Sequence, residues 1–284
     1  MKYQNNILNK VECLICPRKC KLKEGQRGFC YVRKNVNNNI ILETYGFNTG
    51  LCIDPIEKKP LYHFYPGSKV LSFGTFGCCM GCLFCQNAHI TKVKGNIQDC
   101  DKISPETIVT VAKKYDCKSI AFTYNDPIVF FEYMYDTAKL AQNSGIKTVA
   151  VTSGYMNKEL HQDFFRYIDA ANIDLKGFSE KFYPKNCLAH LNPVLDTIKY
   201  AVKSGVHVEL TTLLISEEND DPEMLKKECE WIVENLGYDI PLHFSRFFPK
   251  YKFTSYPITP LETLLKAEKI AKNAGIKFVH LGNV

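Results

Sequence analysis

The sequence has no run of about 18 apolar residues, the length a membrane-spanning helix needs, and its N-terminus, MKYQNNILNK, lacks the hydrophobic core of a signal peptide. It is also poor in cysteine for a disulfide-stabilised protein. Thirteen cysteines in 284 residues are about 5%, below the roughly 8–10% of such scaffolds, and the number is odd. These absences predict a cytoplasmic protein that does not enter a membrane. In a reducing compartment its cysteines serve metal binding, redox chemistry or packing.

The first group of cysteines lies in a basic segment. Cys13, Cys16, Cys20 and Cys30 fall within residues 10–34, which carry eight lysines and arginines and two acidic residues. The local excess equals the formal net charge of the whole chain, +6. Because four thiolates around a metal form a negative centre that cations stabilise, the charge favours a metal site over a nucleic-acid arm. Four thiolates suit zinc and an iron–sulfur cluster equally, so both metals stay open here.

The chain divides by pattern into two predicted domains. Residues 1–66 are turn-rich and are expected to form a small cysteine-rich metal-binding domain. Residues 67–284 alternate apolar strands with amphipathic helices. The strands are expected to begin near Lys69, Ser119, Lys147, Ala171, His207, Pro241 and Lys277. This alternation predicts a parallel α/β sheet curled into a partial or full barrel, with its chemistry at the carboxyl ends of the strands.

The second group of cysteines follows the first of these strands. Cys78, Cys82 and Cys85 form a C-x3-C-x2-C pattern in a loop with glycines, and Cys79 adds a thiol beside the first position. Three protein ligands leave one coordination position open, as a catalytic site requires. A zinc ion would want a fourth ligand, for which His89 is the nearest candidate. The spacing favours an iron–sulfur cluster.

The other cysteines and histidines carry no pattern of their own. Five cysteines are scattered singly, and we expect them to be small buried side chains: Cys52, Cys100, Cys117, Cys187 and Cys229. Four histidines are expected to be surface or core residues: His161, His190, His207 and His280. No general acid–base pair stands out in the sequence.

The cysteine loop after the first strand of an α/β barrel resembles the radical S-adenosylmethionine (SAM) superfamily. The run DPIEKKPLYHFYPGS at residues 54–68, with Cys85-Gln86-Asn87, resembles the radical SAM member of the AmmeMemoRadiSam system, which is similar to pyruvate formate-lyase-activating enzymes. This resemblance covers nearly the whole chain. It implies a partial (β/α)6-type barrel in which Cys78, Cys82 and Cys85 bind three irons of a [4Fe–4S] cluster and SAM chelates the fourth.

The resemblance also implies an activity. Reduced ferredoxin or flavodoxin would supply one electron, SAM would be cleaved to a 5′-deoxyadenosyl radical, and the radical would take a hydrogen atom from a protein or peptide substrate. The same chemistry on a small molecule or on RNA is the alternative, and a non-catalytic zinc or iron–sulfur protein is another. The N-terminal cysteines resemble the cysteine-rich segment of the same family, where zinc and an auxiliary iron–sulfur cluster are both open. No membrane partner is expected.

SAM contacts are implied at the ends of the later strands. Residues 123–127 take the place of the family's Gly-Gly-Glu-Pro segment, although relatives usually carry Glu where this chain has Asp126. Ser153 stands where Asn is commoner. The implied SAM contacts are Tyr124, Asn125, Asp126, Thr152, Ser153, Asp174, Lys176, Thr212 and His243. On residue patterns alone, Asn-Asp-Pro is an ordinary helix-starting turn, Asp174 and Lys176 form a barrel ion pair, and His243 is a core histidine.

Overall fold

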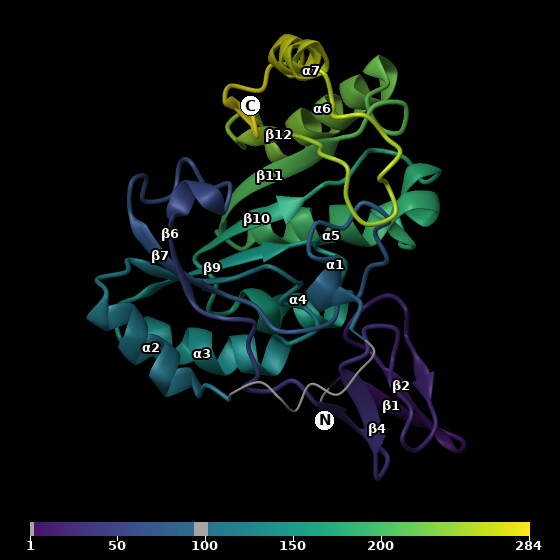
Figure 1. Cartoon of the computed structure of the whole chain (residues 1–284), viewed down its shortest axis with the longest axis vertical. Helices are drawn as coiled ribbons and strands as arrows, with labels where there is room; N and C mark the ends of the chain where they lie inside the picture. The colour runs from purple at the N-terminus through teal and green to yellow at the C-terminus, as the bar shows by residue number, and fades with distance from the viewer. Residues whose placement is uncertain (1–2, 94–101) are drawn as a thin grey trace.

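An eight-stranded sheet organises the chain in the computed structural model, which describes residues 3–93 and 102–284 (Figure 1). Its spatial order is β13-β12-β11-β10-β9-β8-β7-β6. Neighbours from β7 to β13 are parallel, and β6 joins the edge antiparallel to β7. The strands are β6 (Cys52–Pro55), β7 (Lys69–Phe73), β8 (Ser119–Phe122), β9 (Lys147–Thr152), β10 (Ala170–Asp174), β11 (His207–Leu214), β12 (Leu242–Arg246) and β13 (Val279–Gly282). The predicted α/β fold is confirmed.

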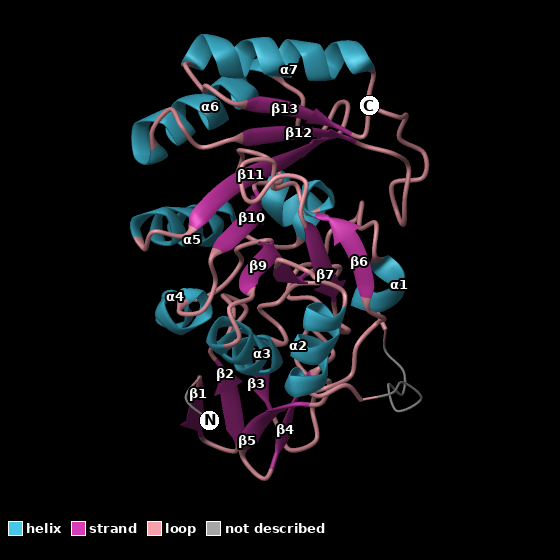
Figure 2. Cartoon of the chain, turned by 90° about the vertical axis from the view of Figure 1, so that its left-hand side faces the viewer, coloured by secondary structure: helices cyan, strands magenta, loops and turns pink. Residues whose placement is uncertain are grey.

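Helices cover one face of this sheet. Figure 2 shows α4, α5 and α6 along the same side of β9, β10 and β11. The main helices are α2 (Pro105–Lys114), α3 (Phe131–Asn143), α4 (Lys158–Phe165), α5 (Leu191–Lys203), α6 (Pro222–Leu236) and α7 (Leu261–Ala274). Shorter turns are η1 (Ile56–Lys58), α1 (Ala88–Thr91) and the π-helical η2 (Tyr183–Cys187). In the described part of the chain, none of the helices is both apolar and long enough for a bilayer crossing.

The alternating side chains of the strands divide the core in two. One set packs under the helices, including Ile120, Ala171 and Leu210. The alternate set faces away from the helices and packs against the segment of residues 56–64 that follows β6. This second cluster consists of Ile56, Leu61, Phe64, Val70, Ala121, Val149 and Ala170. The segment of residues 56–64 therefore fills the inner face of the curved sheet near the beginnings of its strands.

The N-terminal residues form two small antiparallel sheets. β1 (Gln4–Ile7), β2 (Lys10–Cys13) and β3 (Lys21–Leu22) form the first, and β4 (Arg33–Val36) pairs with β5 (Asn39–Leu42) in the second. Both lie at the end of the molecule opposite α7 (Figures 1 and 2). The division at residue 66 stays a prediction, and β6, on its N-terminal side, is hydrogen-bonded into the large sheet.

A buried carboxyl group on α6 gives a stability test. Glu228 is fully buried, Oε1 lies 2.5 Å from the Thr212 hydroxyl, and Oε2 has no partner among the described residues. Burial raises the pKa of Glu228 from 4.5 to about 8. The contribution of Glu228 to the free energy of unfolding is therefore complete below pH 4.5. It is lost as the pH rises through about 8, because Glu228 ionises at a lower pH in the unfolded chain than in the folded protein.

Glu228→Gln is expected to raise the free energy of unfolding at pH 8 by about 1–3 kcal/mol, because the amide has no charge to desolvate. Near pH 4.5 the two proteins should differ little. Urea denaturation at both pH values measures this difference. An equal effect at the two pH values would contradict the shifted ionisation of Glu228.

Candidate iron–sulfur site

The loop that carries the three-cysteine motif is tied to the next strand end by one amide side chain. Asn125 Oδ1 accepts from the Thr75 backbone N–H at 2.9 Å, and Asn125 Nδ2 donates to the carbonyl oxygens of Phe76 at 3.1 Å and Gly77 at 3.0 Å. Asn87, just beyond the motif, donates back to the Tyr124 carbonyl at 2.6 Å. Asn125 thus fixes the start of the cysteine loop, a role that the sequence did not indicate.

Asn125→Ala is expected to lower the free energy of unfolding by about 2–3 kcal/mol, since it leaves the backbone groups of residues 75–77 without partners. Asn125→Asp should cost at least as much, because it turns a carboxylate toward two carbonyl oxygens. Urea denaturation gives both values, with Asn235→Ala on the exposed face of α6 as the control. A loss no larger than that of the control would contradict this role.

The far side of the loop rests on the η2 turn. Gly81 donates its N–H to the Cys187 carbonyl at 2.8 Å, and Leu83 donates to the Asn186 carbonyl at 2.9 Å. Cys187 is fully buried, and its thiol is hydrogen-bonded to Cys82. The sequence predicted only a packing role for Cys187. Its contact with Cys82 joins segments about a hundred residues apart, so no spacing in the sequence could reveal it.

The three motif thiols share one electrostatic environment. The pKa of Cys82 is lowered to about 7, first by the hydrogen bond from Cys187 and then by the nearby Lys176 and Lys92 ammonium groups. Burial raises the pKa of Cys85, and the negative potentials of Cys82 and Cys78 add to that rise. Three soft sulfur donors, flanked by fixed cations, are a fitting ligand set for an iron–sulfur cluster. His89 is exposed on α1.

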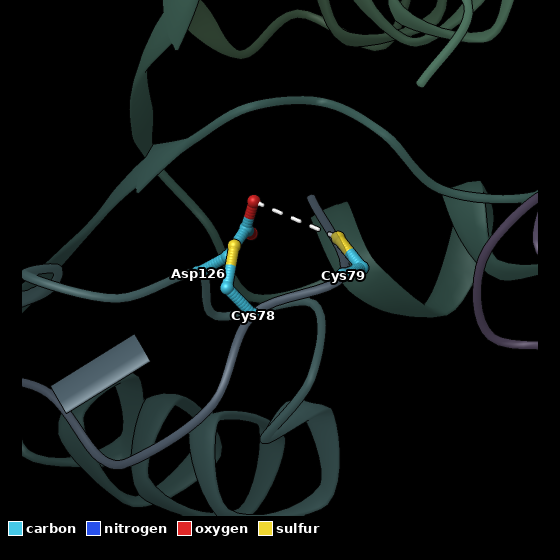
Figure 3. Close-up of side chains that lie close together, drawn as sticks. All are labelled: Cys78, Cys79 and Asp126. Atoms are coloured by element: carbon cyan, nitrogen blue, oxygen red, sulfur yellow. Dashed lines mark hydrogen bonds between the residues drawn. The ribbon is translucent and has the colours of Figure 1, made fainter. Parts of the chain in front are cut away.

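Asp126 lies where the cysteine loop meets the ends of β8 and β9 (Figure 3). The sulfurs of Cys78 and Cys79 and a carboxylate oxygen of Asp126 lie mutually within 4.8 Å. Asp126 also accepts from the Thr152 hydroxyl at 2.9 Å, from the Ser153 N–H at 3.1 Å and from the Ser153 hydroxyl. Burial raises the pKa of Asp126, and these donors oppose the rise. The structure thus gathers three predicted SAM contacts, and they bond to one another.

Asp174 and Lys176 lie beside the cysteine loop from the end of β10. Lys176 Nζ is 3.0 Å from Asp174 Oδ2 and lies over the Phe84 ring, 6.0 Å from its centroid. Burial opposes the charging of Lys176, but Asp174 and Cys82 outweigh it and raise the pKa of the ammonium group. The ion pair predicted from the residues is present, and it adds a cation next to a motif thiol.

Tyr124 and Thr212 do not share the environment of these residues. The Tyr124 hydroxyl donates to Asp54 Oδ2 at 3.3 Å, and its ring lies under Lys59 Nζ at 4.9 Å. Thr212 points to the helix side of the sheet, where its hydroxyl is 2.8 Å from the Leu175 carbonyl and close to Glu228. Strand side chains alternate, and Thr211 takes the inner face beside His243, so the SAM contact of Thr212 stays a prediction.

His243 belongs to a buried polar network on that inner face. Its Nε2 lies 2.7 Å from Glu209 Oε2, and His207 Nε2 lies 3.0 Å from Oε1 of the same residue. Burial alone would raise the pKa of Glu209. Its hydrogen bonds with the two histidines and with the N–H groups of Tyr62 and His63 outweigh burial and lower the pKa to about 2. The sequence did not indicate Glu209, because it lies inside a strand and all its partners except His207 are distant in the chain.

The N-terminal cysteines are brought together as predicted. Cys13, Cys16, Cys20 and Cys30 line one cavity, and Cys79 of the motif loop lines it too. Of the scattered cysteines, Cys117, Cys187 and Cys229 are buried, whereas Cys52 on β6 is exposed and that expectation was wrong. Cys100 lies outside the described residues. β6 is an edge strand, so a side chain on it can face solvent.

A parallel α/β sheet with a three-thiol loop after its first parallel strand defines the class of iron–sulfur proteins with a partial barrel. The family model of the radical SAM superfamily matches residues 73–229, more than half of the chain. The chain belongs to the radical SAM superfamily. Membership implies a [4Fe–4S] cluster and SAM as cofactors, and the donor set of the motif loop fits the cluster.

Curated relatives place the chain near two proteins. It is 45% identical over 284 residues to the Uncharacterized protein MJ0808 of Methanocaldococcus jannaschii, covering 100% of this chain and 84% of that protein. It is 28% identical over 125 residues to the 4-hydroxyphenylacetate decarboxylase activating enzyme of Clostridium scatologenes, covering 43% of this chain and 40% of that enzyme. The second relationship is distant and confined to part of each chain.

Solved structures share the fold. A radical SAM methyltransferase from Sphaerobacter thermophilus superposes with a TM-score of 0.60 at 14% identity, covering 78% of this chain and 68% of that one. A domain of pyruvate-formate lyase-activating enzyme from Bacteroides vulgatus gives 0.51 at 18% identity, covering 58% and 99%. At these identities the likeness concerns the fold alone.

Proposed function

We propose that this protein is the radical SAM enzyme of the AmmeMemoRadiSam system and that it takes a hydrogen atom from a protein or peptide substrate. The observation that carries the radical chemistry is the buried loop of Cys78, Cys82 and Cys85 within a superfamily member. The choice of a polypeptide is supported by the partial similarity to an enzyme named as the activator of a decarboxylase.

In this proposal Cys78, Cys82 and Cys85 bind the [4Fe–4S] cluster. The cluster and SAM together supply a 5′-deoxyadenosyl radical, which is the chemistry of the cofactors and not of a side chain. The chain contributes position and charge. Lys92 donates to the Met80 carbonyl at 2.6 Å, and Lys176 is held by Asp174, so two cations stand beside the thiolates without competing for the metal.

The SAM contacts are proposed in two groups. Lys176 and Asp174 lie next to the cysteine loop and are charged groups suited to the carboxylate and hydroxyls of SAM. Asp126, Thr152 and Ser153 form the buried wall opposite Cys78 and Cys79, and their bonds to one another fix its shape. Asn125 and Tyr124 act through the loop backbone, and His243 acts through Glu209.

Reduced ferredoxin or flavodoxin is the proposed electron donor. The class of substrate can be determined from 5′-deoxyadenosine release. Anaerobically reconstituted protein, given SAM and dithionite, should release 5′-deoxyadenosine. Extract from the native host should then increase that release. Loss of the increase after protease digestion of the extract supports a polypeptide substrate. Loss of the increase after RNase digestion would instead indicate an RNA substrate. If a low-molecular-weight fraction still increased the release after both digestions, the substrate would be a small molecule.

Crosslinking in the native host, followed by mass spectrometry, identifies the polypeptide itself. Zinc in both cysteine groups, with no iron after anaerobic purification and no 5′-deoxyadenosine, would overturn the enzymatic proposal. It would favour a non-catalytic metal protein.

A further inference from the structure

A thiol-lined cavity lies directly beside the motif loop. Its volume is about 20 Å³. Four of its thiols come from the N-terminal segment and the fifth, Cys79, comes from the motif loop. The other walls are apolar or cationic: Ile15, Leu22, Phe29, Val129, Arg18 and Arg33. A cavity with so many thiols and cations has the composition of a binding site for a metal–sulfur centre.

The spacing of the N-terminal thiols distinguishes a single ion from a cluster. Zinc with four thiolates at about 2.3 Å requires its sulfurs to lie only about 3.8 Å apart. Over residues 3–93 and 102–284, the one group of three ligand atoms mutually within 4.8 Å is Cys78, Cys79 and Asp126, so no three N-terminal thiols converge on one point. An iron–sulfur cluster instead binds each thiolate at a different iron around a core of sulfide, so its ligands surround a space.

The cavity also holds an unpaired donor. Arg33 is only 1% exposed and pairs with Glu132 through both terminal nitrogens, at 2.9 and 2.6 Å. Its Nε–H has no partner in the described part of the structure. A buried donor left unpaired costs about 1–3 kcal/mol, and a thiolate or sulfide in the cavity would accept from it.

Cys79 connects this cavity to the motif. Its thiol reaches the Tyr155 carbonyl at 3.7 Å and Asp126 Oδ2 at 4.0 Å, and it also interacts with Cys16, whose pKa it lowers. Its peptide neighbour is the motif cysteine Cys78. Arg18 donates from Nε to the Cys79 carbonyl at 2.6 Å, and its guanidinium also reaches the Leu188 carbonyl beside η2. The two groups of cysteines therefore share one wall of the protein.

We propose that this cavity binds a second iron–sulfur cluster through Cys13, Cys16, Cys20 and Cys30, with Arg33 Nε–H as a donor to it and Cys79 as a hydrogen-bond donor to its ligand Cys16. Each of the four thiols releases its proton when it binds iron. The motif loop contributes no ligand to this cluster. The inference therefore stands or falls separately from the proposed radical activity.

The test removes the motif thiols and counts what remains. The triple variant Cys78→Ala, Cys82→Ala, Cys85→Ala is reconstituted anaerobically with iron and sulfide, with zinc offered in parallel. Retention of about two to four irons per chain with matching sulfide, seen by metal analysis and Mössbauer spectroscopy, is expected. Adding Cys20→Ala should remove this iron, whereas adding Cys117→Ala should not. Zinc in place of iron, or no metal at all, would overturn the inference.

Two further measurements keep the test decisive. If the triple variant does not fold, Cys20→Ala in the otherwise unchanged chain should lose the iron of one cluster and keep that of the other. Cys79→Ala in the triple variant should keep its iron but lower the midpoint potential, because a donor to a ligand sulfur is lost. An unchanged potential would exclude Cys79 from this role.

Discussion

Cys82→Ala is expected to abolish the SAM-cleaving activity. Cys82 is the middle ligand of the motif and the one whose thiol is prepared for metal binding, since Cys187 and the two lysines lower its pKa to about 7. Loss of a residue that only orients a ligand costs about 10–100-fold, so loss of the ligand itself should reduce 5′-deoxyadenosine release by at least about 100-fold. The measurement is the rate of release under dithionite, together with iron per chain.

The matched control is Cys117→Ala. Cys117 is a buried cysteine that follows α2 and belongs to neither cysteine group, so its replacement should leave both iron content and release unchanged. If Cys82→Ala released as much 5′-deoxyadenosine as the wild type, the assignment of the motif loop to the cluster would be wrong.

Gly77→Ala is expected to disrupt the junction between the N-terminal segment and the motif loop. Gly77 has φ of +80°, and an added Cβ would lie 2.8 Å from Val32 Cγ1 and closer still to the Cys30 carbonyl oxygen. A backbone atom cannot rotate away, so the N-terminal segment must shift. We expect a loss of at least about 3 kcal/mol in the free energy of unfolding, together with faster proteolysis of the N-terminal residues.

Gly145→Ala separates this clash from the cost of the backbone conformation. Gly145 ends α3 with φ of +71°, and no atom of the described residues lies within 4 Å of the position an added Cβ would take. That variant should lose only about 1 kcal/mol. Equal losses in the two variants, measured by urea denaturation, would show that the contact between Gly77 and the N-terminal segment contributes nothing.

The fold could be predicted from the sequence because its strands are apolar and regularly separated by helices. All seven predicted strands are present as β7 to β13. β6 was missed because it has four residues, mostly exposed, and only its pairing with β7 makes it a strand. The alternation implied a helix between β9 and β10, but the sequence did not locate α4, which is short, with eight residues. Local pattern thus specified the long elements, and tertiary pairing specified the short ones.

The candidate site could be predicted only where it is local in the chain. The spacing of Cys78, Cys82 and Cys85 identified the metal-binding loop, because chelation imposes short intervals. Cys187 carried no such signal, since Cys82 is distant in sequence. Glu209 carried none because only one of its partners, His207, is near it in the chain. The sequence did not show that Thr212 faces the helices and Thr211 the inner face, because a strand end known only to within a residue leaves the alternation undetermined.

The segment of residues 56–64 has a mechanical consequence for whatever enters the barrel. It leaves β6, crosses the inner face, where the Pro60 carbonyl accepts from Asn172 and the Tyr62 and His63 N–H groups donate to Glu209, and reaches His280 on β13. The segment thus connects β6 at one edge of the curved sheet to β13 at the other. Ile56, Leu61 and Phe64 of this segment pack against the inner face near the beginnings of the strands. The proposed polypeptide substrate would therefore have to approach from the carboxyl ends of the strands, where the cysteine loop lies.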